Sequence, residues 1–331
     1  MTVSIHLSRF HFFTLVLSLP NSALMNRPIP AFLFLLFVMP QLSFSQWTDD
    51  STLNTIVKDQ NGSSEVTPLS VTTSEGYTYV SWFESSAGSY VMKMQLLDAQ
   101  GNKLWDDDGL LISDHPQESA LYVYDLAVDH DNNAIVAFQD IRNTDLQVVA
   151  YKVDENGNFI WGNDGIVLHD TTANFELAPS IGVLSNNDVI IAWTATYSNY
   201  KWVPFRKINA DGSLPGTVLE IKAPTSSTDY SRPDFVPLSD GSFIMTYVKE
   251  TGNFPGLTSL IYADKFDANG IAQWSVPTKI SSYSISFVAY PYVTGDNGNG
   301  AIVCFGSGTI GNPFLGDVFV QRIDENGTLL F

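Results

Sequence analysis

A short motif recurs along this chain at a nearly constant interval, and this repeat constrains the fold more than any other feature. In the motif, an Asp is followed three residues later by Gly and four residues after that by an aromatic residue. It occurs as Asp98/Gly101/Trp105, Asp154/Gly157/Trp161, Asp267/Gly270/Trp274 and Asp324/Gly327/Phe331, and in a weaker form as Asn209/Gly212. The first residues lie 56, 55, 58 and 57 positions apart. Such a period with short strand-like segments is typical of propeller blades or other β arrays.

The motif itself predicts a β-hairpin. The Asp side chain can bond the backbone of its own turn, and Gly supplies the positive φ that a bulged hairpin needs. The Trp begins the returning strand, where a large ring can cover the neighbouring sheet. We therefore expect structural roles for residues such as Gly157 and Trp161.

Four short segments recur between successive motifs, and the third of them is the most regular. It carries the aromatic series Trp82, Phe138, Trp193, Tyr247 and Phe305. These residues stand 56, 55, 54 and 58 positions apart, which is an independent copy of the period. Because nearly every position of this segment is apolar, both of its faces should be covered, as in the inner strands of stacked sheets.

Four antiparallel strands per repeat form the blade of a β-propeller, so the sequence predicts an all-β propeller of five blades. Residues 46–331 are expected to form this single domain of five repeats of about 57 residues. A strand near Leu53–Val57 could complete the last blade and close the ring. The alternative is a fragment of a longer propeller, because Trp47 and Phe331 occupy the same repeat position.

Residues 1–45 are predicted to be a signal peptide, with Met25 as the true start. A basic residue, an apolar core over residues 31–39 and the small residues near Ser45 follow in the expected order. The alternative is a membrane anchor, but Pro40 interrupts the apolar run. The protein is therefore expected to be secreted, periplasmic or on the cell surface, with no membrane span in the mature chain.

Charge and cysteine content exclude several classes of protein. The chain holds 16 Lys and Arg against 35 Asp and Glu, and such an acidic surface repels phosphate backbones, so no nucleic-acid partner is expected. Cys304 is the only cysteine, which excludes an internal disulfide. It lies in an apolar segment and is expected to be a buried, unreactive thiol.

No metal or cofactor is expected. Asp129-x-Asp131-x-Asn133 resembles a calcium loop, yet Ala134 stands where such a loop needs Gly. Three histidines occur after the leader, and none has the spacing of a metal site or a catalytic triad, so they are expected at the surface: His115, His130 and His169.

The loops after the third segment differ in length and content between repeats, whereas the turns on the opposite face are short and uniform. Variable loops on a regular scaffold usually carry binding residues, so we expect the ligand site on the variable face. The candidate residues are Asp140, Arg142, Tyr197, Tyr200, Trp202, Arg232 and Glu250. Aromatics with a few carboxylates suit sugar or peptide recognition. The three aromatic candidates are expected to offer flat apolar surface.

The order of an Arg-Pro strand, an apolar strand, Asp-x-Arg, a hairpin and Trp resembles sialidase-like propellers and the related repeat proteins that bacteria secrete. Arg232-Pro233 resembles the start of the sialidase arginine-proline motif, and Asp140-x-Arg142 resembles the acid that follows it. The hairpins resemble Asp boxes with one extra residue before Gly and without the leading Ser. The two fragments lie in different repeats, and neither an arginine triad nor a Tyr/Glu nucleophile pair is evident. The resemblance therefore implies the fold and no catalytic residue.

Two functions are compatible with this pattern. The preferred interpretation is a secreted module that binds a glycan or an extracellular protein, or has a structural role, without catalysis, because no aligned catalytic set is evident. The alternative is a glycoside hydrolase with carboxylates at the propeller axis. Such an enzyme needs two carboxylates about 5 to 10 Å apart. The candidates for them are Asp140, Asp229 and Glu250.

Overall fold

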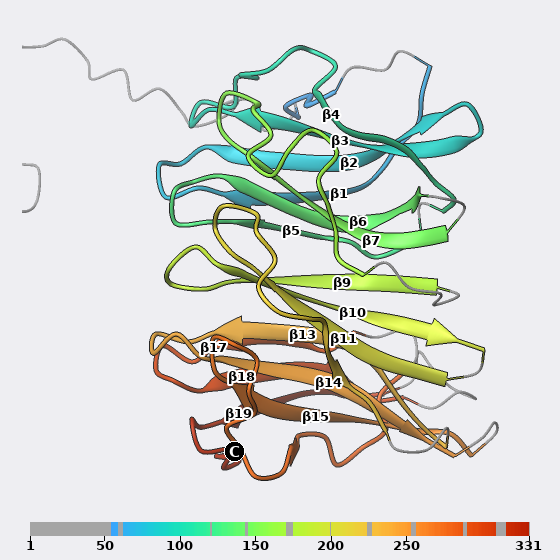
Figure 1. Cartoon of the computed structure of the whole chain (residues 1–331), viewed down its shortest axis with the longest axis vertical. Coiled ribbons are helices and arrows are strands. Elements are labelled where there is room, and N and C mark those ends of the chain that lie inside the picture. Colours follow the sequence, from blue (N-terminus) through green and yellow to red (C-terminus); the bar gives the residue numbers. More distant parts are fainter. Residues whose placement is uncertain are drawn as a thin grey trace, which may run out of the picture. The chain divides into compact units, whose positions relative to one another are not determined.

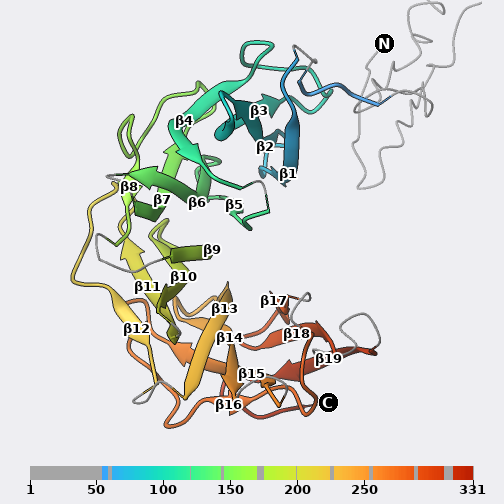
Figure 2. The ribbon, with the colours of Figure 1, turned by 90° about the vertical axis from the view of Figure 1, so that its right-hand side faces the viewer.

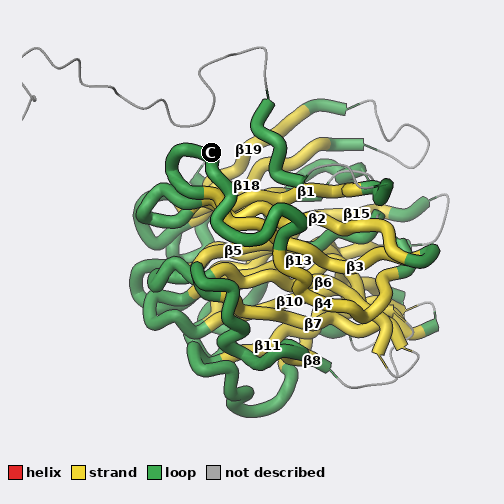
Figure 3. Tube along the Cα trace, turned by 90° about the horizontal axis from the view of Figure 1, so that it is seen from above, coloured by secondary structure: helices red, strands yellow, loops and turns green. Residues whose placement is uncertain are grey.

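The computed structural model describes residues 54–330, except for gaps at 59–61, 120, 143–144, 170–174, 199, 224–226, 253–255, 287–289 and 309–315. Residues 46–330 belong to one compact unit, and the predicted signal peptide lies outside the described residues. Strands and loops make up this part of the chain, without a helix (Figure 3). Accordingly, no membrane-spanning helix is found among the residues described.

The strands form five antiparallel sheets in chain order, four of them with four strands and the last with three. Sheet 1 contains β1 (Glu65–Thr72), β2 (Thr78–Ser86), β3 (Ser89–Leu97) and β4 (Leu110–Gln117). Sheet 2 contains β5 (Asp125–Val128), β6 (Ala134–Arg142), β7 (Asp145–Val153) and β8 (Ile166–Val167). Sheet 3 contains β9 (Phe175–Val183), β10 (Val189–Tyr197), β11 (Tyr200–Ile208) and β12 (Leu219–Ile221). Sheet 4 contains β13 (Thr228–Pro237), β14 (Phe243–Thr251), β15 (Thr258–Phe266) and β16 (Thr278–Lys279), and sheet 5 contains β17 (Tyr292–Gly295), β18 (Ala301–Gly306) and β19 (Val318–Ile323).

The first strand of each sheet lies beside the first strand of the next sheet. Contacts join β1 to β5, β5 to β9, β9 to β13 and β13 to β17, and we call these five the inner strands (Figures 1 and 2). This is the arrangement of propeller blades, and it confirms the predicted all-β propeller of five sheets.

Each hydrophobic core cluster lies between two consecutive sheets. Phe83 packs near Phe138 across sheets 1 and 2, with ring centroids 6.2 Å apart, and Phe205 meets Phe243 across sheets 3 and 4 at 6.4 Å. All five members of the predicted aromatic series are buried. In sheets 2 to 4 the third segment therefore has both faces covered, as its composition predicts, whereas in β18 buried and partly exposed residues alternate.

The hairpin motif has the predicted geometry. The Asp98 carboxylate accepts hydrogen bonds from the backbone N–H groups of Gln100 and Asn102, and Gly101 has a φ of 81°. In addition, each motif Trp donates its indole N–H to a carbonyl of the next hairpin. These bonds are Trp105 to Glu155 at 2.9 Å, Trp161 to Ala210 at 3.2 Å and Trp274 to Glu325 at 3.0 Å. The Trp thus joins consecutive repeats.

The weaker third motif, Asn209/Gly212, has no Trp to offer to the hairpin of sheet 4. There, Leu219 and Phe205 pack against Gly270 instead, and a Cβ on this Gly would meet them at 2.3 and 2.8 Å. The hairpin of sheet 4 is therefore in apolar contact with strands β11 and β12 of sheet 3 at this point.

Three expectations need correction. Residues 54–58 form no strand, because Lys58 is held at sheet 1 by Asp108 and Glu84, so the described part of the predicted Leu53–Val57 strand is not one. Cys304 is partly exposed, since it lies on the face of β18 opposite the buried Val303. Finally, the strands on either side of the loop after the third segment run further than expected in sheets 1 to 3, so only two residues separate β2 from β3, β6 from β7 and β10 from β11.

Candidate functional site

A cavity of about 290 Å³ lies where the five inner strands come together. Residues of all five sheets line it, together with residues that directly precede inner strands β5 and β17. They are Leu69, Val123, Tyr124, Asp125, Ala178, Pro179, Ser180, Arg232, Pro233, Asp234, Tyr290, Pro291 and Tyr292. A concave, largely apolar site with a few convergent polar groups is the usual form of a small-molecule site. We call it the axis cavity.

Five residues of the lining occupy one equivalent position of the repeat. Each pairs with the residue just before the aromatic of the third segment, as Asp125 pairs with Ala137 next to Phe138. The five are Leu69, Asp125, Ser180, Asp234 and Tyr292. Because the scaffold accepts Leu, Ser, Asp or Tyr at this position, the differences between these residues give the cavity its chemistry.

The two carboxylates of this set are held by hydrogen bonds between sheets. Asp125 Oδ2 accepts from the backbone N–H of Ile181 on β9 at 2.7 Å. Asp234 Oδ2 accepts from the N–H of Val293 on β17 at 3.0 Å, and its Oδ1 accepts from the hydroxyl of Ser180 on β9 at 3.2 Å. A carboxylate has about four acceptor sites, so both groups keep capacity for a ligand.

The environment of both carboxyl groups favours the protonated form. Burial raises the pKa of Asp125, although hydrogen bonds from Ile181 and Leu126 oppose this shift. Burial, with a smaller contribution from the negative charge of Asp125, raises the pKa of Asp234 to about 6. Two carboxyl groups that repel each other in a cavity, with pKa values moved toward neutrality, are typical of an acid–base site.

The backbone around the axis cavity is strained. Thr67, Ala178 and Arg232 have φ values of 50°, 51° and 52°, and all three stand two residues before a member of the equivalent set. Register shifts mark β-bulges at the same places in sheets 1, 3 and 4. Left-handed non-glycine residues cost of order 1–3 kcal/mol each and concentrate at functional sites. The bulges place the strain at the cavity wall.

Two of the sequence candidates come together here. Arg232 lines the cavity, and its guanidinium donates to Glu250 Oε1 at 2.9 Å and to the carbonyl of Ser286 at 3.3 Å. Lys201 lies 3.1 Å from the other carboxylate oxygen of Glu250. Glu250 is therefore the charge partner of Arg232 and Lys201, and it does not line the cavity.

Asp140 and Arg142 lie elsewhere, on β6. The Arg142 guanidinium donates to Asp140 at 2.8 Å and to the Tyr151 hydroxyl at 2.7 Å, and the Asp140 side chain is fully buried. Asp229 accepts the backbone N–H of Lys201 at 2.9 Å. Asp140, Asp229 and Glu250 are the sequence's candidates for the axis carboxylates of a hydrolase, but none of them lines the axis cavity, where Asp125 and Asp234 lie instead.

The aromatic candidates fall into different environments. Tyr197 is exposed, Tyr200 is half-buried, and Trp202 is only 6% exposed as part of a core cluster. Tyr200 and Trp202 stack with ring centroids 5.7 Å apart, and the Lys222 ammonium lies 4.7 Å from the Trp202 ring. The expectation that Trp202 offers open surface is wrong, because it lies within β11 rather than in a loop.

One histidine is also placed differently from the expectation. His169 has a side chain that is 14% exposed, with Nδ1 2.7 Å from the buried Glu176 carboxylate. In the calcium-like segment, Asp129 accepts the N–H groups of Asp131 and Asn133 and pairs with Lys152 at 2.7 Å, as a turn residue would. No cluster of three metal-ligating side chains occurs among the described residues.

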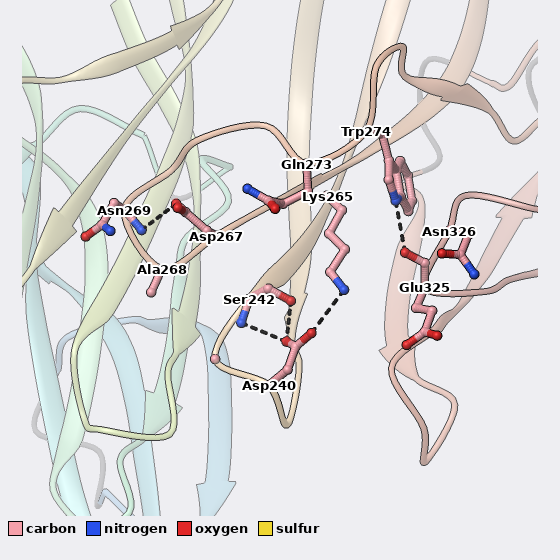
Figure 4. Close-up of a pocket in the computed structure, with 11 residues that line it drawn as sticks. Asp240, Ser242, Lys265, Asp267, Ala268, Asn269, Gln273, Trp274, Glu325 and Asn326 are labelled. Carbon is pink, nitrogen blue, oxygen red and sulfur yellow. Dashed lines mark hydrogen bonds and ion pairs between the residues drawn. The ribbon is translucent and has the colours of Figure 1, made fainter.

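A second cavity, of about 530 Å³, lies at the uniform turns of sheets 4 and 5 (Figure 4). Its contacts are Trp274 with Glu325 and Lys265 with Asp240 at 3.1 Å. Both contacts recur in other repeats, the latter as Lys207 with Asp188 at 2.8 Å. This cavity therefore belongs to the repeated scaffold, whereas the residues of the axis cavity differ between repeats.

Sequence reasoning missed Asp125 and Asp234. Both stand in inner strands beside apolar residues, where an Asp is uncommon. The aromatic series could have located them, because each of these Asp residues pairs with the residue just before an aromatic of the third segment. These pairs are Asp125 with Ala137 and Asp234 with Thr246.

No protein-family model matches the chain, and no curated protein matches it. Among solved structures, an α-L-arabinanase of Penicillium chrysogenum in complex with arabinobiose is 15% identical, with a TM-score of 0.50 over 78% of this chain and 81% of that one. A GH93 α-L-arabinofuranosidase of Fusarium graminearum is 11% identical, with a TM-score of 0.52 over 82% of both chains. A PL25 ulvan lyase is 10% identical, with a TM-score of 0.51 over 80% of this chain and 68% of the lyase.

These similarities show the propeller fold, and the similar proteins are enzymes that act on glycans. They overturn the preferred interpretation of the sequence, a binding or structural module without catalysis. That interpretation rests on the lack of an aligned catalytic set in the loops, whereas Asp125 and Asp234 lie in inner strands.

Proposed function

We propose that this protein is a glycoside hydrolase whose acid–base pair is Asp125 and Asp234. The observation that carries the proposal is the pair of carboxyl groups at one repeat position of the axis cavity, with the pKa of Asp234 raised to about 6 by burial and by the charge of Asp125. The glycan-active enzymes of similar fold support it.

Asp234 is the general acid in this proposal. Its raised pKa keeps the proton available near pH 6, and the protonated carboxyl gives that proton to the glycosidic oxygen as the bond to the anomeric carbon breaks. Asp125, when ionised, takes a proton from the water that adds to the anomeric carbon. Strand β9 bonds both carboxylates, Asp125 through the N–H of Ile181 and Asp234 through the hydroxyl of Ser180.

The test compares Asp234→Asn and Asp125→Asn with Asp107→Asn, a matched change at a side chain that is 94% exposed outside the cavity. Arabinan, xylan and galactan serve as substrates, with release of reducing ends as the measurement. Loss of general acid catalysis costs about 10²- to 10⁴-fold in rate. We expect losses of this size for both cavity variants and none for Asp107→Asn. Equal activity in all four proteins, or none in the wild type, contradicts the proposal.

We further infer that the protein is exported and cleaved after Ser45. The order of basic, apolar and small residues before this position supports the inference, and so does the arabinan-degrading activity named for the similar enzymes.

A further inference from the structure

Two tyrosines that line the axis cavity leave much of their side chains exposed to solvent. Tyr290 is 37% exposed and Tyr292 is 71% exposed, and both line the cavity. Tyr292 occupies the equivalent position at which sheets 1 and 3 have Leu69 and Ser180. Since a small or aliphatic residue serves the scaffold there, the large exposed ring is not needed for the fold.

Tyr290 is fixed in place by its neighbour. The Arg232 guanidinium lies 5.8 Å from the centroid of the Tyr290 ring, and it is itself bound by Glu250. A cation at such a distance is attracted to the aromatic face. Tyr292 is fixed by its backbone, which pairs with Cys304 in the β17–β18 ladder. The two rings are therefore attached to ordered elements at the cavity mouth.

The charges at the cavity select against anionic ligands. Asp125 and Asp234 contribute carboxyl groups, and the positive charge of Arg232 is matched by Glu250 at 2.9 Å. The chain as a whole carries a formal charge of −19. The net negative charge of the chain therefore repels an approaching carboxylate or sulfate, and Arg232, the cation of the described lining, is already bound by Glu250.

Flat aromatic surface beside acidic groups suits the apolar face of a neutral sugar ring. We propose that Tyr292 is a stacking residue for a neutral glycan and that the axis cavity discriminates against uronate-containing or sulfated chains. This inference rests on the proposed function for its site, but it concerns binding, which is measured separately from hydrolysis.

The experiment is affinity electrophoresis of the full chain in native gels that contain arabinan or ulvan, whose repeat carries glucuronate and a sulfated rhamnose. The Asp234→Asn background prevents hydrolysis of the gel polysaccharide. Into it we place Tyr292→Ala, Tyr292→Phe and, as the matched control, Tyr197→Ala, which removes a tyrosine of 56% exposure outside the cavity.

We expect retardation by arabinan and not by ulvan. Tyr292→Ala should raise the apparent dissociation constant for arabinan at least tenfold, Tyr292→Phe should stay within about twofold, and Tyr197→Ala should have no effect. Equal retardation by ulvan, retardation by neither polysaccharide, or an unchanged dissociation constant in Tyr292→Ala overturns the inference. If binding follows the expectation while Asp234→Asn leaves hydrolysis intact, the proposed function fails and this inference stands.

Discussion

Asp125 on β5 accepts the backbone N–H of Ile181 on β9 at 2.7 Å, so a single side chain both joins two consecutive sheets and faces the axis cavity. Asp234 repeats this relationship with Val293 on β17. The carboxylates that we propose for catalysis thus also accept hydrogen bonds that join neighbouring sheets. This double role connects the stability of the protein to the protonation state of the site.

The first prediction concerns stability and pH. The pKa of Asp234 is raised from 3.8 to about 6, so protonated Asp234 contributes stability that is fully present below about pH 3.8 and is lost as the pH rises through about 6. Asparagine does not titrate. The melting temperature of the wild type minus that of Asp234→Asn should therefore fall between pH 4 and pH 7, as followed by thermal melts. A difference that stays constant over this range contradicts the raised pKa.

The second prediction uses two glycines that share a left-handed backbone. Gly212 and Gly216 have φ values of 88° and 69°, but a Cβ on Gly212 would meet the Trp161 ring at 2.7 Å, while a Cβ on Gly216 meets nothing within 4 Å. Both changes to Ala carry the backbone penalty of about 1 kcal/mol. We expect Gly212→Ala to lower the free energy of unfolding by about 1–3 kcal/mol more than Gly216→Ala, because of overpacking. Urea denaturation measures this difference, and equal losses would mean that the Trp161 ring moves freely.

The third prediction extends this point to Trp161 itself, which is 7% exposed and packs between consecutive repeats. Trp161→Ala should cost about 3–5 kcal/mol of stability. Thermal and urea unfolding give the value. A melting temperature of Trp161→Ala within one degree of the wild type would contradict a structural role for the repeated Trp.

The fourth prediction separates Trp202 from Tyr200. Trp202 is nearly buried in the cluster between sheets 2 and 3, so Trp202→Ala should lower stability by about 3–5 kcal/mol. Tyr200 is half-buried and donates its hydroxyl to the carbonyl of Ala223 at 2.8 Å, so Tyr200→Ala should cost less. If Trp202→Ala has the melting temperature of the wild type, Trp202 is not a core residue and would again be a candidate for ligand binding.

The fifth prediction concerns export. The intact mass of protein recovered from the medium or the periplasm should correspond to a chain that begins at Gln46. A recovered chain that retains residues 25–45 would instead support the membrane anchor.

The sequence predicts the fold well because the period is expressed twice, once in the hairpins and once in the aromatic series that includes Phe138 and Trp193. The functional site was predicted less well, since the search followed loop variability. Asp140 and Glu250 are strand residues paired with Arg142 and Arg232, and nothing in the local sequence shows which face of a strand they occupy. Arg232, which was expected in a variable loop, lies within β13 and lines the cavity, and its role in binding stays a prediction.

Between sheets 3 and 4, Leu219 and Phe205 meet Gly270 at the position where other hairpins are joined by an indole-to-carbonyl bond. A hydrogen bond fixes an angle, whereas an apolar contact fixes mainly a distance. The hairpin edge between sheets 3 and 4 is therefore held by apolar packing, whereas Lys201 and Glu250 pair at 3.1 Å elsewhere between the same sheets. At the cavity, the Ser180 hydroxyl donates a hydrogen bond to Asp234 across the same two sheets at 3.2 Å. The boundary beside the proposed catalytic Asp234 is thus held by two kinds of contact, apolar packing at the hairpin and a hydrogen bond at the cavity.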